Sequence, residues 1–262
     1  MNQSFGGFMI IPDFSVGEIL GRSISLLMQN PLTYLGLPLL ALLPGLLVRI
    51  IIHFTASPLL GLVTIISPLL MLCLQGAVTY AVYQGLRGEK AGFRESIWRG
   101  LARFFSILWA SILIGLSFYG CIMIVAFSAS TGVAIISILG VFIFIFLIIL
   151  LCCMLLVSLP VCVVEKQSAL NSIRRSVDLT KGYRLKIFAL LLIVFLCTIL
   201  FYGLAIFIVA LSAKYVAIIT IMLTLTFIIP TAFTSVMIAV IYYNLRQVKE
   251  GASLDSLTGV FD

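Results

Sequence analysis

The chain has 262 residues, of which 63% are hydrophobic and only 10% are charged, and its formal net charge is +7. Soluble domains are nearer half apolar and a quarter charged, so this composition excludes a water-soluble fold and predicts a protein partly covered by lipid. The basic residues flank apolar stretches, where anionic lipids attract them, so the positive charge does not indicate a nucleic-acid partner.

The first predicted element is a short amphipathic helix over residues 13–30. Its apolar side chains recur at helical spacing and form one face: Val16, Ile19, Leu20, Leu26 and Leu27. Asn30-Pro31 is a typical helix-ending pair. Residues 1–12 carry no positive charge, so no cleavable signal peptide is expected.

Six apolar stretches follow, each with the ~20 residues needed to cross the hydrocarbon layer of a bilayer. We expect these spans at about 32–52, 59–84, 104–127, 133–160, 187–211 and 216–243. Proline interrupts the first span at Pro38 and Pro44, the second at Pro68 and the sixth at Pro230, and each such helix should bend or break there.

Two more amphipathic segments separate the second span from the third and the fourth from the fifth. Residues 86–103 carry an apolar stripe at helical spacing: Phe93, Ile97, Leu101 and Phe104. Residues 165–186 carry a shorter one: Ala169, Ile173 and Val177. Both segments are basic, and such helices are expected to lie on the membrane surface.

The positive charge is distributed unequally between the two sides of the predicted bundle. All lysines and arginines except Arg49 and Lys214 fall in the two tails and in alternate connections. Because cytoplasmic loops carry the excess of basic residues, both termini are expected in the cytoplasm.

A weak internal repeat relates the three amphipathic segments. Arg22, Arg99 and Arg175 align, and a small residue follows each one: Ser23, Gly100 and Ser176. A carboxylate stands four residues before the first two arginines, a spacing that supports a helix.

The repeating unit is therefore one interfacial helix followed by two spans, used three times. The units are expected at 13–84, 89–160 and 165–243, and a cytoplasmic tail follows at 244–262. These boundaries predict a single all-α integral membrane domain over residues 1–262, with a parallel pseudo-threefold axis along the membrane normal. Alternatively, the three segments are similar only because each meets the same requirements for membrane insertion, without a duplication.

Two stretches carry a family resemblance: VVEKQSALNSIRRSVDLTKGYRLKIF, from Val163, and the tail YYNLRQVKEGASLDSL, from Tyr242. They resemble a family of bacterial six-span membrane proteins that includes YciC-like proteins and the membrane domain fused to some glycerophosphodiester phosphodiesterases. The resemblance implies a bacterial inner (cytoplasmic) membrane location and the six-span layout. It implies no activity, because the family has none generally established and the phosphodiesterase domain is absent here.

The residues offer little catalytic chemistry. The chain has one histidine, His53, and its nine acidic residues avoid the middle of every predicted span. Its six cysteines lack the C-x-x-C spacing of a metal or redox site and are expected to be small packing residues. We therefore expect no catalytic residues, no metal, no cofactor and no enzyme activity.

Two candidate sites remain. Arg22, Arg99 and Arg175 could bind one anionic lipid headgroup, because guanidinium groups match phosphate oxygens; the alternative is that they only extend towards the interface. Gln75 with Thr224, Thr226 and Thr231 forms a candidate polar path. The alternative for the threonines is that their hydroxyls bond back to the backbone beside Pro230.

Two functions follow from these sites. The first is a non-enzymatic protein acting through membrane lipids, a protein partner or a second copy of itself, in membrane or envelope organisation. The second is a small permease or channel-like transporter, or the membrane subunit of a transport complex.

Overall fold

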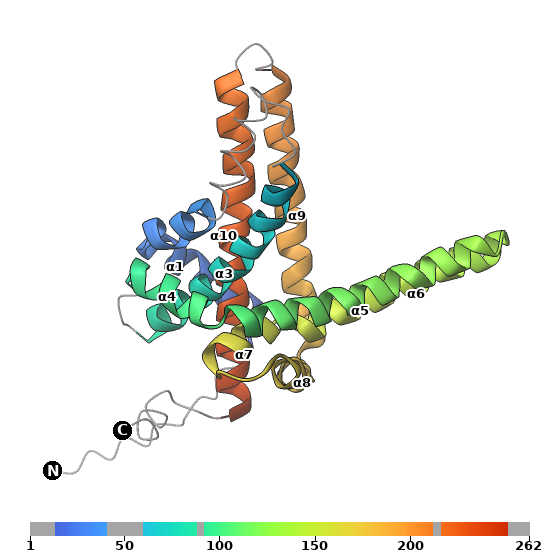
Figure 1. Cartoon of the computed structure of the whole chain (residues 1–262), viewed down its shortest axis with the longest axis horizontal. Coiled ribbons are helices and arrows are strands. Elements are labelled where there is room, and N and C mark those ends of the chain that lie inside the picture. The colour runs from blue at the N-terminus through green and yellow to red at the C-terminus, as the bar shows by residue number, and fades with distance from the viewer. Residues whose placement is uncertain (1–13, 41–59, 88–91, 212–215, 251–262) are drawn as a thin grey trace.

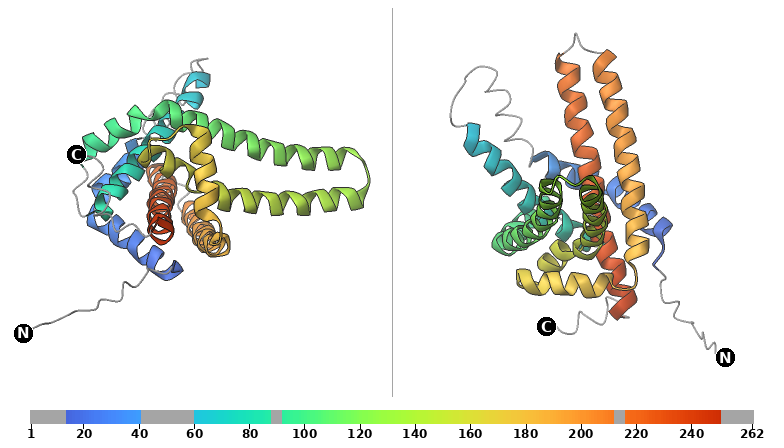
Figure 2. Two further views of the ribbon diagram at one scale, coloured as in Figure 1. Left: turned by 90° about the horizontal axis from the view of Figure 1, so that it is seen from below. Right: turned by 90° about the vertical axis from the view of Figure 1, so that its right-hand side faces the viewer.

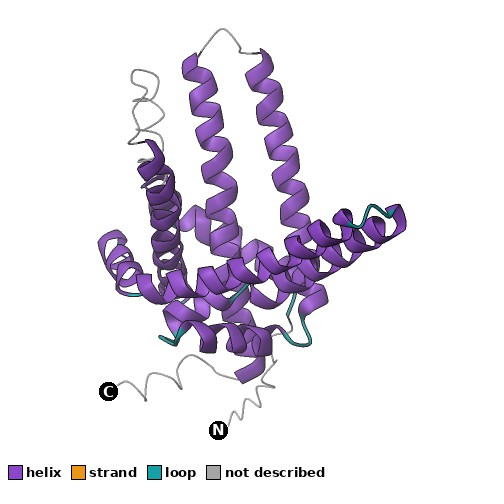
Figure 3. Cartoon of the chain, turned by 45° about the vertical axis from the view of Figure 1, so that its right-hand side comes forward, coloured by secondary structure: helices purple, strands orange, loops and turns teal. Residues whose placement is uncertain are grey.

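The computed structural model describes residues 14–40, 60–87, 92–211 and 216–250, of which 60–70, 72–73, 210–211 and 216–225 are described by backbone alone. The described residues form helices and no strands (Figures 1 and 3). The helices are α1 Val16–Gln29, a helix at Pro31–Leu40, α3 Leu60–Leu86, α4 Phe93–Ala102, α5 Phe104–Ser130, α6 Ala134–Leu155, α7 Ser158–Val164, α8 Ala169–Thr180, α9 Arg184–Leu211 and α10 Val216–Glu250.

Four helical segments are long and apolar enough to cross a membrane: Phe104–Ser130, Ala134–Val164, Arg184–Val209 and Thr226–Glu250. They lie at the expected third to sixth spans, so the chain is an all-helical protein with several membrane-spanning candidates. The first expected span continues through residues 41–52, outside the described residues. The second falls on α3, whose first side chains are also not described, so the number six stays a prediction.

The four segments differ in how much of their surface the protein itself covers. Only 11% of the most apolar window of α5, 6% of that of α6 and α7, and 11% of that of α9 is buried, against 61% for α10. Large apolar side chains such as Phe142 and Phe207 therefore face outwards at 66% and 61% exposure. This distribution indicates a lipid-facing surface on α5, α6 and α9, and a central position for α10.

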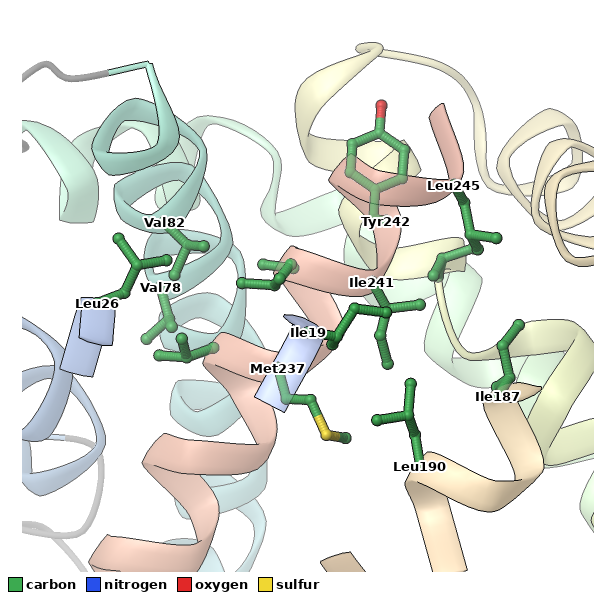
Figure 4. Packing of buried hydrophobic residues seen from close by; sticks show 14 of the residues in the cluster. Ile19, Leu26, Val78, Val82, Ile187, Leu190, Met237, Ile241, Tyr242 and Leu245 are labelled. Carbon is green, nitrogen blue, oxygen red and sulfur yellow. The ribbon is translucent and has the colours of Figure 1, made fainter. Parts of the chain in front are cut away.

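The second half of α10 passes through the packed core. Met237, Ile241 and Leu245 contact residues of α1, α3 and α9, including Ile19, Val78 and Leu190, and all six are buried (Figure 4). Seen from below in Figure 2, α10 runs end-on through the middle, with α1 and the α7–α8 segment on opposite sides. We call this packed region the body.

The α5–α6 hairpin leaves the body in a direction clearly different from that of α9 and α10 (Figures 1 and 3). It joins the body through two backbone breaks. Arg103, with φ −107° and ψ 9°, separates α4 from α5, and Leu156 and Val157 separate α6 from α7. At its base, Ile107 packs with Cys162 and Val163 of α7 in a small second core.

Within the hairpin, Gly140 of α6 packs closely against Ser128 of α5. A Cβ atom on Gly140 would lie 2.5 Å from the Cβ atom of Ser128. Since real Cβ atoms never come so near, only glycine allows the two helices this separation.

Candidate functional site

Each of the three amphipathic helices buries a small residue against the body. Ser23 of α1, Gly100 of α4 and Ser176 of α8 are all buried, and each directly follows one of the three aligned arginines. Ser23 donates a hydrogen bond to the carbonyl oxygen of Ile19 at 2.7 Å, and Ser176 donates to that of Met154 at 2.7 Å. Because these hydroxyls find backbone acceptors, they can be buried without an unpaired polar group.

The apolar stripes expected in the second and third segments are only partly buried: Ile97 packs against the core, and Ala169, Ile173 and Val177 are half-buried. On α4 the buried residues are Ser96 and Gly100, whereas Phe93 and Leu101 are 37% and 48% exposed. Trp98 on the same helix is 72% exposed. Trp98 and Leu101 thus point away from the protein, whereas Ile97 packs against the core.

The three arginines occupy three separate environments. Arg22 pairs with Glu18 at 2.7 Å, and Arg99 lies 3.9 Å from Glu95, as the spacing of four residues predicts. The Arg99 guanidinium also lies 5.6 Å from the centre of the Tyr80 ring. The three arginines thus have different partners, and one phosphate shared by all three stays a prediction.

Arg175 has no carboxylate four residues before it and finds two elsewhere. Its Nε lies 3.4 Å from Glu165 Oε2, and its Nη2 pairs with Glu250 at the end of α10. Glu250 also accepts a hydrogen bond from Arg246 Nε at 2.8 Å. The Tyr242 hydroxyl donates to Glu165 Oε1 at 3.0 Å and completes the group.

These five residues, Glu165, Arg175, Tyr242, Arg246 and Glu250, form the α8–α10 charge cluster. The exposed fractions of its four charged side chains are 10% for Glu165, 32% for Arg175, 19% for Arg246 and 27% for Glu250. Two carboxylates balance two guanidinium groups, so the cluster carries little net charge. It links the chain before α8 to the end of α10, and this arrangement favours a structural role over catalysis.

The cluster brings together the two stretches that carry the family resemblance. Glu165 and Arg175 belong to the first, and the other three residues belong to the second. Leu179 and Leu245, also from the two stretches, are both buried in the core beside it. The two motifs are therefore parts of one tertiary contact.

The candidate polar path contains a contact between helices. Ser235 Oγ lies 2.7 Å from Gln75 Oε1 of α3 and 2.8 Å from the carbonyl oxygen of Thr231. Thr231 itself donates to the carbonyl oxygen of Phe227 at 2.7 Å, as the back-bonding alternative expects. Thr226 is buried, and the side chain of Thr224 lies outside the described residues.

Replacing Ser235 by alanine is expected to lower the free energy of unfolding by about 0.5–1.5 kcal/mol, because Gln75 loses a partner between two packed helices. Thermal unfolding in detergent measures the change. Ser117→Ala is the matched control, since the Ser117 hydroxyl is exposed and bonds only within α5. Equal melting temperatures for the two variants would contradict a stabilising contact.

A polar pocket of about 380 Å³ lies where α1, the end of α3 and the last turns of α10 meet. Its lining comes from three helices: Arg22, Ser25, Leu26, Gln29, Gly85, Leu86, Tyr243 and Gln247. Of these, only Arg22 was a sequence candidate. No sequence pattern connects the other lining residues, because their proximity depends on how the three helices pack.

Among the described residues, no group of three or more His, Cys, Asp or Glu side chains is placed to hold a metal ion. Scans against protein-family models, curated proteins and solved structures found no match to the chain.

Proposed function

We propose that the chain is a non-enzymatic integral protein of the bacterial inner membrane, with six spans and both termini in the cytoplasm. In this proposal it acts through contacts that α1, α4 and α8 make with anionic lipids or with a protein partner. A role in membrane or envelope organisation fits such contacts.

The observation that carries the proposal is that each amphipathic helix has one face packed on the body and another face exposed. The packed face of each helix includes a small residue, while α4 turns Arg94, Trp98 and Leu101 outwards. On α1, Met28 is 75% exposed. Exposed tryptophan and arginine together suit the headgroup region, where each basic residue contributes about 1 kcal/mol of attraction to anionic lipid.

The helix contacts support the proposed pseudo-threefold arrangement. α4 packs on α3, α8 packs on α7, and α1 packs on α10. α4 and α8 each lie against the end of the span that precedes them in the chain. α1, the first of the described helices, lies against α10, the last of them, so the three pairs are related as they would be around a threefold axis. The three inner helices α3, α7 and α10 contact one another in the centre.

The transporter alternative has less support. A conducting path needs polar groups that face an open cavity, whereas Gln75 and Ser235 bond to each other at the contact of α3 and α10.

Native mass spectrometry from a mild detergent tests the proposal. The protein is expected to retain phosphatidylglycerol in preference to phosphatidylcholine. The double variant Arg94→Gln with Trp98→Ser should lower that retention about fivefold for the lost charge alone, at roughly 1 kcal/mol per basic residue. Both side chains are exposed, so the melting temperature should not change. Equal retention of both lipids by the unmodified protein would refute the proposal.

A further inference from the structure

The pocket between α1, α3 and α10 differs from the rest of the surface in the chemistry of its walls. Arg22, Ser25 and Gln29 reach it from successive turns of α1, and Gln247 reaches it from α10. No carboxylate belongs to the described residues that line it. Every one of these four side chains can donate hydrogen bonds, so the pocket suits an acceptor-rich anion.

The contacts within the pocket leave donors available. Gln29 Nε2 bonds to Ser25 Oγ at 3.2 Å, and Gln247 Nε2 bonds to the Tyr243 hydroxyl at 3.1 Å, so each amide keeps a second N–H. Glu18 lies 2.7 Å from one terminal nitrogen of Arg22, and the guanidinium has five N–H groups. Arg22 can therefore keep its carboxylate partner and still bind two oxygens of a ligand.

Close packing of α1 and of the helix at Pro31–Leu40 against Gly85 of α3 shapes the pocket. Gly85 lets the Tyr34 hydroxyl approach, since a Cβ atom at that position would lie 2.8 Å from it. Leu26 and Leu86 supply an apolar wall beside the donors. The pocket is open to the surface and has a volume of about 380 Å³.

We propose that this pocket binds one anionic phosphate group, with Arg22 as its main ligand and Ser25, Gln29 and Gln247 as further donors. The inference rests on the proposed function and deepens it. In place of one phosphate shared by Arg22, Arg99 and Arg175, it assigns the phosphate to Arg22 alone. The phosphate belongs either to a lipid headgroup or to a free anion. The apolar wall of Leu26 and Leu86 favours the lipid.

Binding of short-chain lipids to the full-length protein in detergent provides the test. Dihexanoylphosphatidylglycerol should bind, and dihexanoylglycerol, which lacks the phosphate, should not. Arg22→Gln should weaken binding at least tenfold, because it removes the charge and the paired donors. Lys181→Gln, an exposed charge between α8 and α9 that does not line the pocket, should change binding less than twofold.

A second variant keeps the test decisive if Arg22→Gln impairs folding. Ser25→Phe fills the pocket from an exposed position of α1 and should abolish binding with the charge intact. If inorganic phosphate, at the same concentration as dihexanoylphosphatidylglycerol, displaces that lipid, the site is supported and its ligand is a free anion. Unchanged binding in Arg22→Gln and Ser25→Phe would overturn the pocket, even if the unmodified protein still preferred anionic lipid and the proposed function stood.

Discussion

Replacement of Glu165 by glutamine is expected to lower the free energy of unfolding by about 2 kcal/mol. Breaking a buried ion pair costs about 3–5 kcal/mol, but here Arg175 is one-third exposed and keeps Glu250, so the smaller value applies. The variant also weakens the acceptor of the Tyr242 hydroxyl. At about 2–4 °C per kcal/mol for a chain of this size, the melting temperature in detergent should fall by about 4–8 °C.

A double-mutant cycle with Arg175→Met separates the pair from the other contacts of each residue. A coupling energy above about 0.5 kcal/mol is expected for side chains in direct contact. Glu18→Gln is the matched control, because its ion pair with Arg22 is about 40% exposed on both sides and should contribute less than about 1 kcal/mol. If both glutamine variants lose the same stability, the α8–α10 charge cluster does not hold α10 in place.

The second large effect is expected at Gly140, where alanine should cost about 1–3 kcal/mol. The added methyl group would meet Ser128 of α5 at Cβ as well as at Oγ, so a rotamer change cannot relieve the contact. The two helices must separate, and the packing along the hairpin weakens. Thermal unfolding in detergent, followed by circular dichroism, measures the loss.

The contact allows a size-exchange control. Ser128→Gly should restore most of the stability of Gly140→Ala, because it removes the side chain that the new methyl group meets. Gly120→Ala, in the same hairpin, meets no atom within 4 Å and should be neutral or stabilising by up to about 1 kcal/mol. Failure of the exchange, or an equal loss at Gly120, would place the cause outside the Ser128–Gly140 contact.

The elements that depend on local pattern were predictable from the sequence. Long apolar runs correctly predicted α5, α6, α9 and α10, because the length needed to cross lipid is set by the bilayer. The spacing of four residues correctly predicted the pairs Glu18–Arg22 and Glu95–Arg99. The six spans and the threefold repeat remain predictions.

Features that depend on tertiary packing were not predictable in the same way. The apolar stripes of α4 and α8 indicated amphipathic helices, but they did not indicate that the small residues Ser96 and Ser172 are buried. In the third segment Asn171 replaces the expected carboxylate. Arg175 therefore pairs with Glu165 and with Glu250, which lies 75 residues away along the chain, and no periodicity within one helix contains that information.

The attachment of the α5–α6 hairpin makes its far end sensitive to small changes at its base. At 1.5 Å per residue, the 27 residues of α5 form an arm of about 40 Å. A rotation of only about 10° at Arg103 and at Leu156–Val157 would carry the loop after Ser130 through about 7 Å, by the same helical rise. The position of that loop relative to the body is thus determined by a few backbone torsion angles at the other end of the hairpin.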